Sequence, residues 1–461
     1  MHIFAAGMEG RRKNITRIKR GLDEYFDRIL PILKKLHPSD IADVLEEVSP
    51  ESRQRIINVL PVRKVSEALT EMDDELDAAT LLKKMTNEQA ARVIEELHPD
   101  DAADLLANLP ENDLQRIFKR LPPEDEAVIR KLMSYEDDSA GGIMNPELFK
   151  LNGITTKHLA LQEILHISEE IEDFYVIYVI DNDNKLLGAV SLNNLLRASA
   201  SAKLSELMDT GVISVSVDAD QEEAARLMRQ YDLPTIPVVD GDNHLLGRIL
   251  FDDVMDVIHD ESTEDLLKIH GVSEDEELRG TWFEAVKSRI PWLLINVFTA
   301  SAAGFVVLQF RNIIESLAVI AGFMPVIAGV AGNGATQALA VTIRRIATDG
   351  VERTEVWKII LKEISVGVFN GIVVGILVTM TALFLQNESG MENSQPFLLG
   401  LVVFMAMVGN LFVAGFAGSA IPLLLQRLGA DPAVASSILI TGITDILGYL
   451  MLFGFGTALL L

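Results

Sequence analysis

The carboxylates are the most informative chemical groups of this sequence, and one of them stands inside an apolar segment. Asp445 lies in LITGITDILGYLMLFG, within a stretch long enough to cross a bilayer. A bare carboxylate in lipid is costly, so an intramembrane aspartate predicts a functional site. The structural alternatives are an aspartate hydrogen-bonded to a neighbouring helix and one that is simply protonated. No Lys or Arg at a similar depth is available to pair with it. This favours a cation as the partner of Asp445.

A second group of carboxylates precedes the apolar half, in the stretch FDDVMDVIHDESTEDLLKIHG. On a helix, Asp252, Asp256 and Asp260 fall at successive i, i+4 positions, where like charges destabilise an isolated helix. A solvated helix that links two domains is the simpler explanation. The alternative is a Mg²⁺ site, because Mg²⁺ prefers oxygen ligands, keeps much of its water and would relieve the repulsion between these carboxylates. We favour the Mg²⁺ site.

Polar residues also interrupt the apolar stretch MPVIAGVAGNGATQALAVTIRR at 324–345. Asn333 and Gln337 lie four apart, on one face of a helix. Pro325 has no backbone donor and is expected to free a carbonyl one turn earlier, and Gly332 lets a neighbouring helix or a hydrated ion come close. Interhelical amide bonds in a close-packed bundle are one explanation. The wall of a water-filled path is the other, because irregular polar backbone is tolerated where it lines water.

Three further acidic residues stand at the ends of predicted membrane spans. Asp431 precedes Pro432, where a helix cap explains it and a cation site at the membrane surface is the alternative. Glu315 and Glu363 are expected to be solvated at the membrane interface.

Five apolar runs of membrane-spanning length must position these groups. They cover residues 291–310, 316–343, 364–385, 396–426 and 432–461. Basic residues gather before the first run and in the second and fourth connections, whereas the third connection, QNESGMENSQ, has none. This asymmetry predicts a multi-pass protein of the cell (inner) membrane, with the amino-terminal half in the cytoplasm and the carboxy terminus outside.

Charge is distributed as unevenly as hydropathy. The chain has 461 residues, of which 49% are hydrophobic, and its mean hydropathy is +0.25. From residue 281 onward there are 10 acidic and 9 basic residues, so the first 280 residues hold 57 acidic and 31 basic ones, a net charge of −26. Such an acidic half repels nucleic acid and attracts cations, so no nucleic-acid partner is expected.

The sequence also bears on disulfides and on catalysis. It has no cysteine, which excludes a disulfide framework and thiolate metal sites. It contains no phosphate-binding glycine loop, nucleophile elbow or metal-binding histidine pair, so we do not expect an enzyme.

A repeat of period 61 occupies the amino-terminal region. HPSDIADVLEEV at 37–48 returns as HPDDAADLLANL at 98–109, and VLP at 59–61 returns as RLP at 120–122. Proline at the helix starts and aspartate in the first turns suit the exposed NH groups and the positive end of each helix dipole. We therefore expect a small all-helical superhelix.

A second repeat has a period of 59 and a different pattern. YVIYVIDNDNKLLGAVSLNNLL at 175–196 aligns with PTIPVVDGDNHLLGRILFDDVM at 234–255. Each copy predicts a strand, a turn, a strand and a helix. The DNDN and DGDN stretches have the composition of calcium loops, but no bidentate glutamate follows at the required offset, so hairpin turns are favoured.

This pair resembles tandem cystathionine-β-synthase (CBS) domains, which in other proteins often bind adenine nucleotides. The ribose motif of such domains has a glycine, a Thr or Ser three residues later, and an aspartate three further on. The corresponding residues are Gly188, Ser191 and Asn194 in the first copy and Gly247, Leu250 and Asp253 in the second. Each copy lacks one polar position, so the resemblance leaves ATP binding open.

Several motifs, taken in order, resemble the MgtE family of magnesium channels. They are YEDDSAGGIM, TEDLLKIHGV, FMPVIAGVAGNGATQALAVTIR and DPAVAS, the last followed by Asp445. The resemblance covers nearly the whole chain from about residue 25. It implies a multidomain protein: an N-terminal segment at 1–24, an all-α superhelical N domain at 25–134, α/β tandem CBS domains at 135–200 and 201–258, a connecting (plug) helix at 259–283, and a five-helix α-helical transmembrane domain at 284–461.

The resemblance also implies a homodimer in membrane lipid, with a pore on the dimer axis lined by the second and fifth membrane helices. Asp445 matches the pore aspartate, which holds a hydrated Mg²⁺ together with backbone carbonyls near Thr441. Pro325, Gly332, Asn333 and Gln337 belong to the matching second-helix motif. The carboxylates that match regulatory Mg²⁺ ligands are Asp100, Asp104, Asp220, Glu222, Asp232, Asp253, Asp256, Glu261, Glu264, Asp265 and Asp431.

The expected function is therefore a Mg²⁺-selective channel for uptake across the plasma membrane. Without cytoplasmic Mg²⁺, the acidic domains repel one another, and as Mg²⁺ rises it bridges them and closes the pore. Mg²⁺ would then be both the transported and the regulatory ion. An ion-coupled divalent-cation transporter and a Mg²⁺ sensor without permeation remain alternatives at this point.

Overall fold

The computed structural model describes residues 26–72, 75–167, 175–272, 282–349, 351, 354–387, 395–434 and 437–460. The predicted N-terminal segment at 1–24 lies outside this range. The chain divides into two units, with the boundary between Val257 and Ile258. This boundary falls inside one helix, next to the predicted domain boundary at residue 258.

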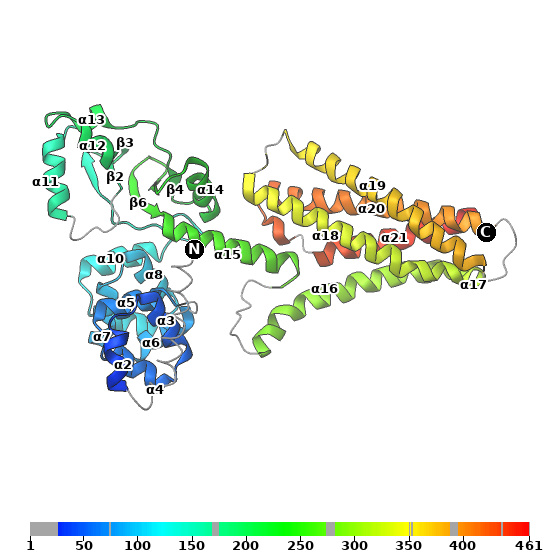
Figure 1. Ribbon diagram of the computed structural model, residues 1–461, viewed down its shortest axis with the longest axis horizontal. Helices are drawn as coiled ribbons and strands as arrows, with labels where there is room; N and C mark the ends of the chain where they lie inside the picture. Colours follow the sequence, from blue (N-terminus) through cyan, green and yellow to red (C-terminus); the bar gives the residue numbers. More distant parts are fainter. Residues whose placement is uncertain are drawn as a thin grey trace. The chain divides into compact units, whose positions relative to one another are not determined.

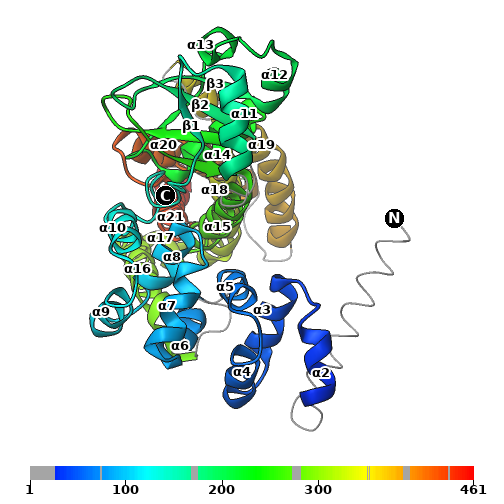
Figure 2. The same cartoon turned by 90° about the vertical axis from the view of Figure 1, so that its left-hand side faces the viewer.

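The first unit begins with short helices joined by tight turns (Figure 2). They are α2 (Phe26–Leu33), α3 (Pro38–Glu47), α4 (Pro50–Ile57), α5 (Val62–Thr70), α6 (Glu75–Lys84), α7 (Asn87–Glu95), α8 (Pro99–Ala107), α9 (Glu111–Phe118) and α10 (Pro123–Leu132). Helices α3 to α5 correspond to α8 to α10 at the spacing of the sequence repeat, which confirms the all-helical N domain. Each of α3, α4, α8 and α10 has proline in its first turn, where the missing NH group costs no helix bond.

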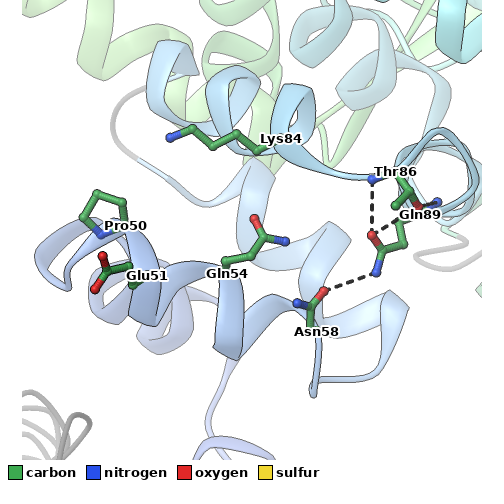
Figure 3. Close-up of a pocket in the computed structure, with 7 residues that line it drawn as sticks. All are labelled: Pro50, Glu51, Gln54, Asn58, Lys84, Thr86 and Gln89. Atoms are coloured by element: carbon green, nitrogen blue, oxygen red, sulfur yellow. Dashed lines mark hydrogen bonds between the residues drawn. The ribbon is translucent and has the colours of Figure 1, made fainter.

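A chain of hydrogen bonds connects the start of α7 to the end of α4. Thr86 and Gln89 form a capping box at the start of α7, in which the Thr86 NH group donates to Gln89 Oε1 at 3.2 Å. Gln89 Nε2 in turn donates to Asn58 Oδ1, at the end of α4, at 3.2 Å (Figure 3). An open hollow of about 660 Å³ lies beside this chain of bonds, bordered by Gln54 and Lys84 among others.

Two small three-stranded sheets follow, one for each copy of the second repeat. The first copy consists of β1 (Lys150–Asn152), α11 (Lys157–Ile167), β2 (Val176–Ile180), β3 (Leu186–Ser191), α12 (Leu192–Arg197) and α13 (Leu204–Leu207). The second consists of β4 (Val215–Ser216), α14 (Gln221–Tyr231), β5 (Thr235–Val239), β6 (Leu245–Leu250) and α15 (Phe251–Ile269). The sheet orders are β1-β2-β3 and β4-β5-β6, with the first pair parallel and the second antiparallel in each.

The turns of these hairpins also join the two copies to each other. In each turn an aspartate carboxylate, Asp181 or Asp240, accepts two backbone NH bonds. This confirms the predicted turns. Asn184 Nδ2 then donates to the carbonyl of Leu245 in the other copy, and Asn243 Nδ2 donates to that of Leu186, both at 2.9 Å. The repeated asparagines therefore hold the CBS copies together as a symmetric pair.

Among the residues that the structure describes, the second unit contains five helices long and apolar enough to cross a membrane. Their ribbons are labelled in Figure 1. They are α16 (Trp282–Gln309), α18 (Met324–Asp349), α19 (Val356–Asn387), α20 (Gln395–Arg427) and α21 (Ser437–Leu460). The short elements α17 (Arg311–Ser316), η1 (Ala318–Phe323) and η2 (Pro432–Val434) lie between them. The five predicted spans are thus confirmed, although α19 begins before predicted residue 364 and α21 begins after predicted residue 432.

These boundaries differ for identifiable reasons. The predicted third span began after Lys358 and Lys362 because they are charged. Both lysines lie on the exposed side of α19, so the helix includes them and begins earlier. Near residue 432, Pro432 begins a 3-10 turn and not the long helix.

The expectation that Glu363 is solvated was wrong, because it is 6% exposed within the protein and pairs with Lys362 at 3.2 Å.

Candidate ion path and carboxylate clusters

Asp445 is half-buried on α21, eight residues after the helix begins at Ser437. Its side chain forms no hydrogen bond or ion pair with any residue that the structure describes. The structural alternative, an aspartate bonded to a neighbouring helix, therefore has no support within this single chain. The carboxylate is left for a ligand, for water or for another chain.

Close helix crossings fix the part of α21 that carries Asp445. A Cβ atom at Gly332 of α18 would lie 3.1 Å from Thr441 Cγ2, so two of the predicted site residues, Gly332 and Thr441, meet where α18 crosses α21. The next residue, Gly442, faces α16, where a Cβ atom would lie 2.6 Å from Cβ of Thr299. One turn of α21 is thus held between two helices, one turn before Asp445.

The two predicted amides of α18 point away from the single-chain bundle. Asn333 and Gln337 are exposed, whereas Ala331, Ala335 and Leu339 on the same helix are fully buried. Lipid offers an amide no hydrogen-bond partner, so a face with two exposed amides requires water or a second protein surface. This face of α18 therefore suits a membrane helix that borders water or a second protein chain.

The expectation that Pro325 frees a carbonyl one turn earlier was wrong. It lies in the first turn of α18, where its missing NH group interrupts no helix. The carbonyl four residues before it, that of Ala321, accepts the Met324 NH group in the preceding 3-10 helix. The irregular backbone lies in η1, and Gly332, Asn333 and Gln337 all belong to regular α-helix.

A first carboxylate cluster, the Asp100 cluster, contains Asp100, Asp101, Asp252 and Asp253. It lies where the first turns of α8 and α15 approach each other. Burial, together with Asp101 and Asp253, raises the pKa of Asp100 well above its usual value. Burial and the neighbouring Asp252 raise the pKa of Asp253 to about 7. Burial and the neighbouring carboxylates thus both oppose the ionisation of Asp100 and Asp253.

The cluster has a feature that suits a cation. Asp100 is buried, and its Oδ1 atom has no hydrogen-bond partner among the described residues. Beside it, His98 contacts Glu147 at 3.2 Å, and that hydrogen bond raises the pKa of His98 to about 9. A buried, unpaired carboxylate oxygen facing other carboxylates fits Mg²⁺, which binds through oxygen or through its own water. Asp104 is exposed on the next turn of α8.

A second cluster, the Lys268 cluster, contains Glu261, Glu264, Asp265, Lys268 and Asp431. Lys268 Nζ donates to Glu264 on the same helix and to Asp431 Oδ2 at 2.9 Å. Asp431 Oδ1 accepts the NH group of Ala433 at 2.7 Å, so the aspartate both caps η2 and holds α15. Burial, Asp431 and Glu261 raise the pKa of Asp265 to about 6. The structure thus places Glu264 and Asp431 on one ammonium group, with Asp265 close to both Asp431 and Glu261.

The predicted ligands in the second CBS copy are not brought together. Asp220 caps the start of α14, where its Oδ1 accepts the Glu222 NH group at 2.8 Å, and Asp232 ends the helix in a left-handed conformation. Eleven helical residues separate the two ends by about 16 Å at ~1.5 Å per residue. Glu222 and Asp256 are exposed. Among the described residues, no three His, Asp or Glu side chains are arranged to hold a bare metal ion.

The nucleotide motif residues have local structural roles. Ser191 Oγ accepts the Asn194 NH group at the start of α12, and Asp253 Oδ2 accepts the Leu250 NH group.

Sequence reasoning missed three other residues near the candidate sites: Thr299, Lys268 and the buried Asn410 of α20. Their significance depends on contacts with distant parts of the chain.

Family models match three parts of the chain. Residues 324–455 match MgtE, a divalent cation transporter, residues 36–138 match the MgtE intracellular N domain, and residues 204–260 match a CBS domain. Five apolar helices joined to a cytosolic domain, with an unpaired carboxylate inside one helix, define a membrane protein that transports divalent cations.

Comparison with individual proteins identifies the family. The magnesium transporter MgtE of Bacillus subtilis is 31% identical over 93% of both chains, and that of Thermus thermophilus is 31% identical over 94% of this chain and 96% of its own. This chain belongs to the MgtE family of magnesium transporters. The family consists of transporters and channels, so the protein is not an enzyme.

Solved structures are similar to the first half of the chain. The cytosolic domain of the Mg²⁺ channel MgtE in complex with ATP is 33% identical, with a TM-score of 0.50, and covers 53% of this chain and 99% of its own. The soluble part of a magnesium transporter is 28% identical, with a TM-score of 0.50, and covers 55% of this chain and 99% of its own.

Proposed function

We propose that this protein is a Mg²⁺-selective channel for uptake, in which α18 and α21 of two identical chains line the ion path. The observation that carries the proposal is the half-buried Asp445 without a partner, next to the Gly332 and Thr441 crossing. The exposed Asn333 and Gln337 support a second chain or water at this face. Two carboxylates facing each other on a two-fold axis would attract a divalent ion more strongly than a monovalent one.

The same carboxylate has to release the ion for conduction to be fast. Mg²⁺ gives up its water reluctantly, so contact through the hydration shell would allow rapid exchange. Helix α21 is well suited to this role because crossings with α16 and α18 fix its position one turn away. The carboxylate is then presented in a fixed place without a direct ligand cage.

The regulatory part of the proposal rests on the two clusters. Mg²⁺ at the Asp100 cluster would join α8 to α15, and Mg²⁺ at the Lys268 cluster would hold α15 on the membrane domain. A near-complete switch needs a differential binding energy of ~5.5 kcal/mol, which several weak sites together can supply. Transported Mg²⁺ would thereby close its own path. The ligands of the second CBS copy, Asp220, Glu222 and Asp232, and the exposed Asp104 and Asp256 remain predictions.

The decisive experiment measures Mg²⁺ flux into liposomes that contain the full-length protein. Asp445→Ala should reduce flux to the level of empty liposomes while the protein stays folded and dimeric. Gly454→Ala is the matched control, because nothing lies within 4 Å of a Cβ atom at that position of α21. Wild-type flux through the Asp445 variant would refute the assigned ion site.

The same liposomes separate the alternative functions. A channel should give flux that follows only the Mg²⁺ gradient and the membrane potential. Flux that needs a Na⁺ or H⁺ gradient would support a coupled transporter, and no flux in wild-type protein would support a sensor.

A further inference from the structure

The buried amide of Asn410 is the strongest unexplained polar feature of the membrane domain. Asn410 lies on α20 and is 0% exposed. Its Nδ2 group donates to the carbonyl of Ile327, on α18, at 3.3 Å. Its Oδ1 atom has no partner within the described part of the chain. A buried amide with an unmet acceptor lowers stability, so stability alone favours an apolar residue of similar size here.

The same side chain also touches the helix that carries Asp445. A Cβ atom at Gly448 of α21 would lie 2.9 Å from Asn410 Cγ and closer still to its nitrogen. Beside it, a Cβ atom at Gly409 would lie 2.7 Å from Met451 Sδ, so α20 meets α21 at two successive residues. Gly448 therefore provides the space that the amide occupies, and α21 can come no closer to α20 at this point.

The contacts of Asn410 bear on both helices of the proposed ion path. Gly448 follows Asp445 by three residues, on the next turn of α21, and Ile327 precedes Gly332 by five residues on α18. The Gly332 and Thr441 crossing holds the two helices together on one side of Asp445, and Asn410 connects them on the other. Asp445 thus lies between two fixed points.

We propose that Asn410 is a positioning residue that sets the spacing of α18 and α21 and so places the Asp445 carboxylate. The inference rests on the proposed role of Asp445 in permeation. A positioning contact differs from a simple stabilising contact in one respect. A stabilising contact, once removed, lowers flux because less protein is folded, whereas a positioning contact lowers flux in protein that remains folded.

The test uses full-length protein in liposomes, with thermal stability measured on the same preparations. Asn410→Leu keeps the branched shape and the number of side-chain heavy atoms without the donor, and it should unfold at the same or a higher temperature while Mg²⁺ flux falls about tenfold or more. Ser419→Ala is the control, because Ser419 is equally buried on α20 but donates only within its own helix, to the carbonyls of Gly415 and Phe416. The control should keep wild-type flux.

Two further variants separate the hydrogen bond from the packing. Asn410→Asp retains a donor to Ile327 when its carboxyl group is protonated, so at about pH 6 its flux should exceed that of Asn410→Leu about tenfold. Gly448→Ala should displace the amide and lower flux, whereas Gly454→Ala, with open space around it, should not.

Several results would overturn the inference. Wild-type flux in Asn410→Leu would remove the amide from positioning, and a loss of flux matched by a loss of folded protein would reduce it to a structural contact. Asp445→Ala is measured in parallel. If that variant conducts normally, the proposed ion site itself fails; if it is inactive while Asn410→Leu conducts normally, only the present inference fails.

Discussion

Replacing Lys268 with methionine tests whether a built-in cation contributes to closure. Methionine has an unbranched side chain of similar length, but it lacks the ammonium group that contacts Glu264 and Asp431. In the absence of Mg²⁺, the Lys268–Asp431 ion pair joins the end of α15 to the loop before α21, and the Lys268–Glu264 pair, within α15, orients the ammonium group. We therefore expect the variant to release α15 more readily when Mg²⁺ is low.

The size of the effect follows from the exposure of the partners. The Lys268 side chain is 18% exposed, that of Glu264 33% and that of Asp431 38%. An ion pair with such solvent access contributes ~0.2–1 kcal/mol, and of the two pairs only Lys268–Asp431 is lost when α15 leaves the loop. The variant should therefore change the ratio of docked to released α15 without Mg²⁺ by at most about fivefold.

At high Mg²⁺ the expectation reverses. An ion that bridges Glu264, Asp265 and Asp431 has to displace the ammonium group in the wild type, but meets no competing positive charge in the variant. Closure at millimolar Mg²⁺ should therefore be preserved or stronger. Lys268→Met should respond to Mg²⁺ over a wider range, with a more open state at low Mg²⁺ and an equally closed state at high Mg²⁺.

The assay is protease cleavage of full-length protein in detergent across a series of Mg²⁺ concentrations, with flux in liposomes as the second measurement. Lys119→Met, at an exposed position outside both clusters, controls for the loss of one positive charge. Equal cleavage of Lys268→Met and wild type without Mg²⁺ would refute the bridging role. Loss of closure at millimolar Mg²⁺ would show that the ammonium group, and not an ion, holds α15.

Two further predictions concern packing and pH. Gly442→Ala should force Thr299 away and destabilise the protein by ~1–3 kcal/mol, which would lower both the unfolding temperature and the Mg²⁺ flux. Gly304→Ala, with open space around it, should change neither quantity. An unchanged unfolding temperature in Gly442→Ala would contradict the crossing of α21 and α16. Without Mg²⁺, stability should rise as pH falls from about 8 to about 5, because the raised pKa values of Asp253 and Asp265 let the folded state bind protons that the unfolded chain does not. Thermal unfolding at several pH values checks this, and Mg²⁺ should flatten the dependence; stability that falls over this range would contradict it.

The elements that the sequence predicts well are those determined by local pattern. Five long apolar runs became five helices, and the DNDN and DGDN stretches became hairpin turns because each aspartate caps its own turn. The same local reasoning failed at Pro325. A proline inside an apolar run predicts a freed carbonyl one turn earlier, but the chain changes from a 3-10 to an α-helix at Met324, and the carbonyl of Ala321 accepts the Met324 NH group.

The remaining features depend on partners that are far apart in sequence. Lys268 and Asp431 are 163 residues apart, and Asn410 and Ile327 are 83 apart. Asn410 in MVGNLFVAGFAG gives no sign of whether its amide faces lipid or the bundle, because α20 is apolar on all sides. Asp445, by contrast, could be identified from sequence because a single carboxylate in an apolar segment is already informative.

Helix α15 has a further consequence. It contains no glycine or proline from Phe251 to Ile269. Near its end, Glu261, Glu264, Asp265 and Lys268 are spaced i, i+3, i+4 and i+7, so they share one face, since each residue adds ~100° of rotation. A single residue inserted between Glu264 and Lys268 would turn Lys268 by more than a quarter of a circle relative to Glu264 and aim it away from Asp431. The spacing of these residues is thus under as strict a constraint as their identity.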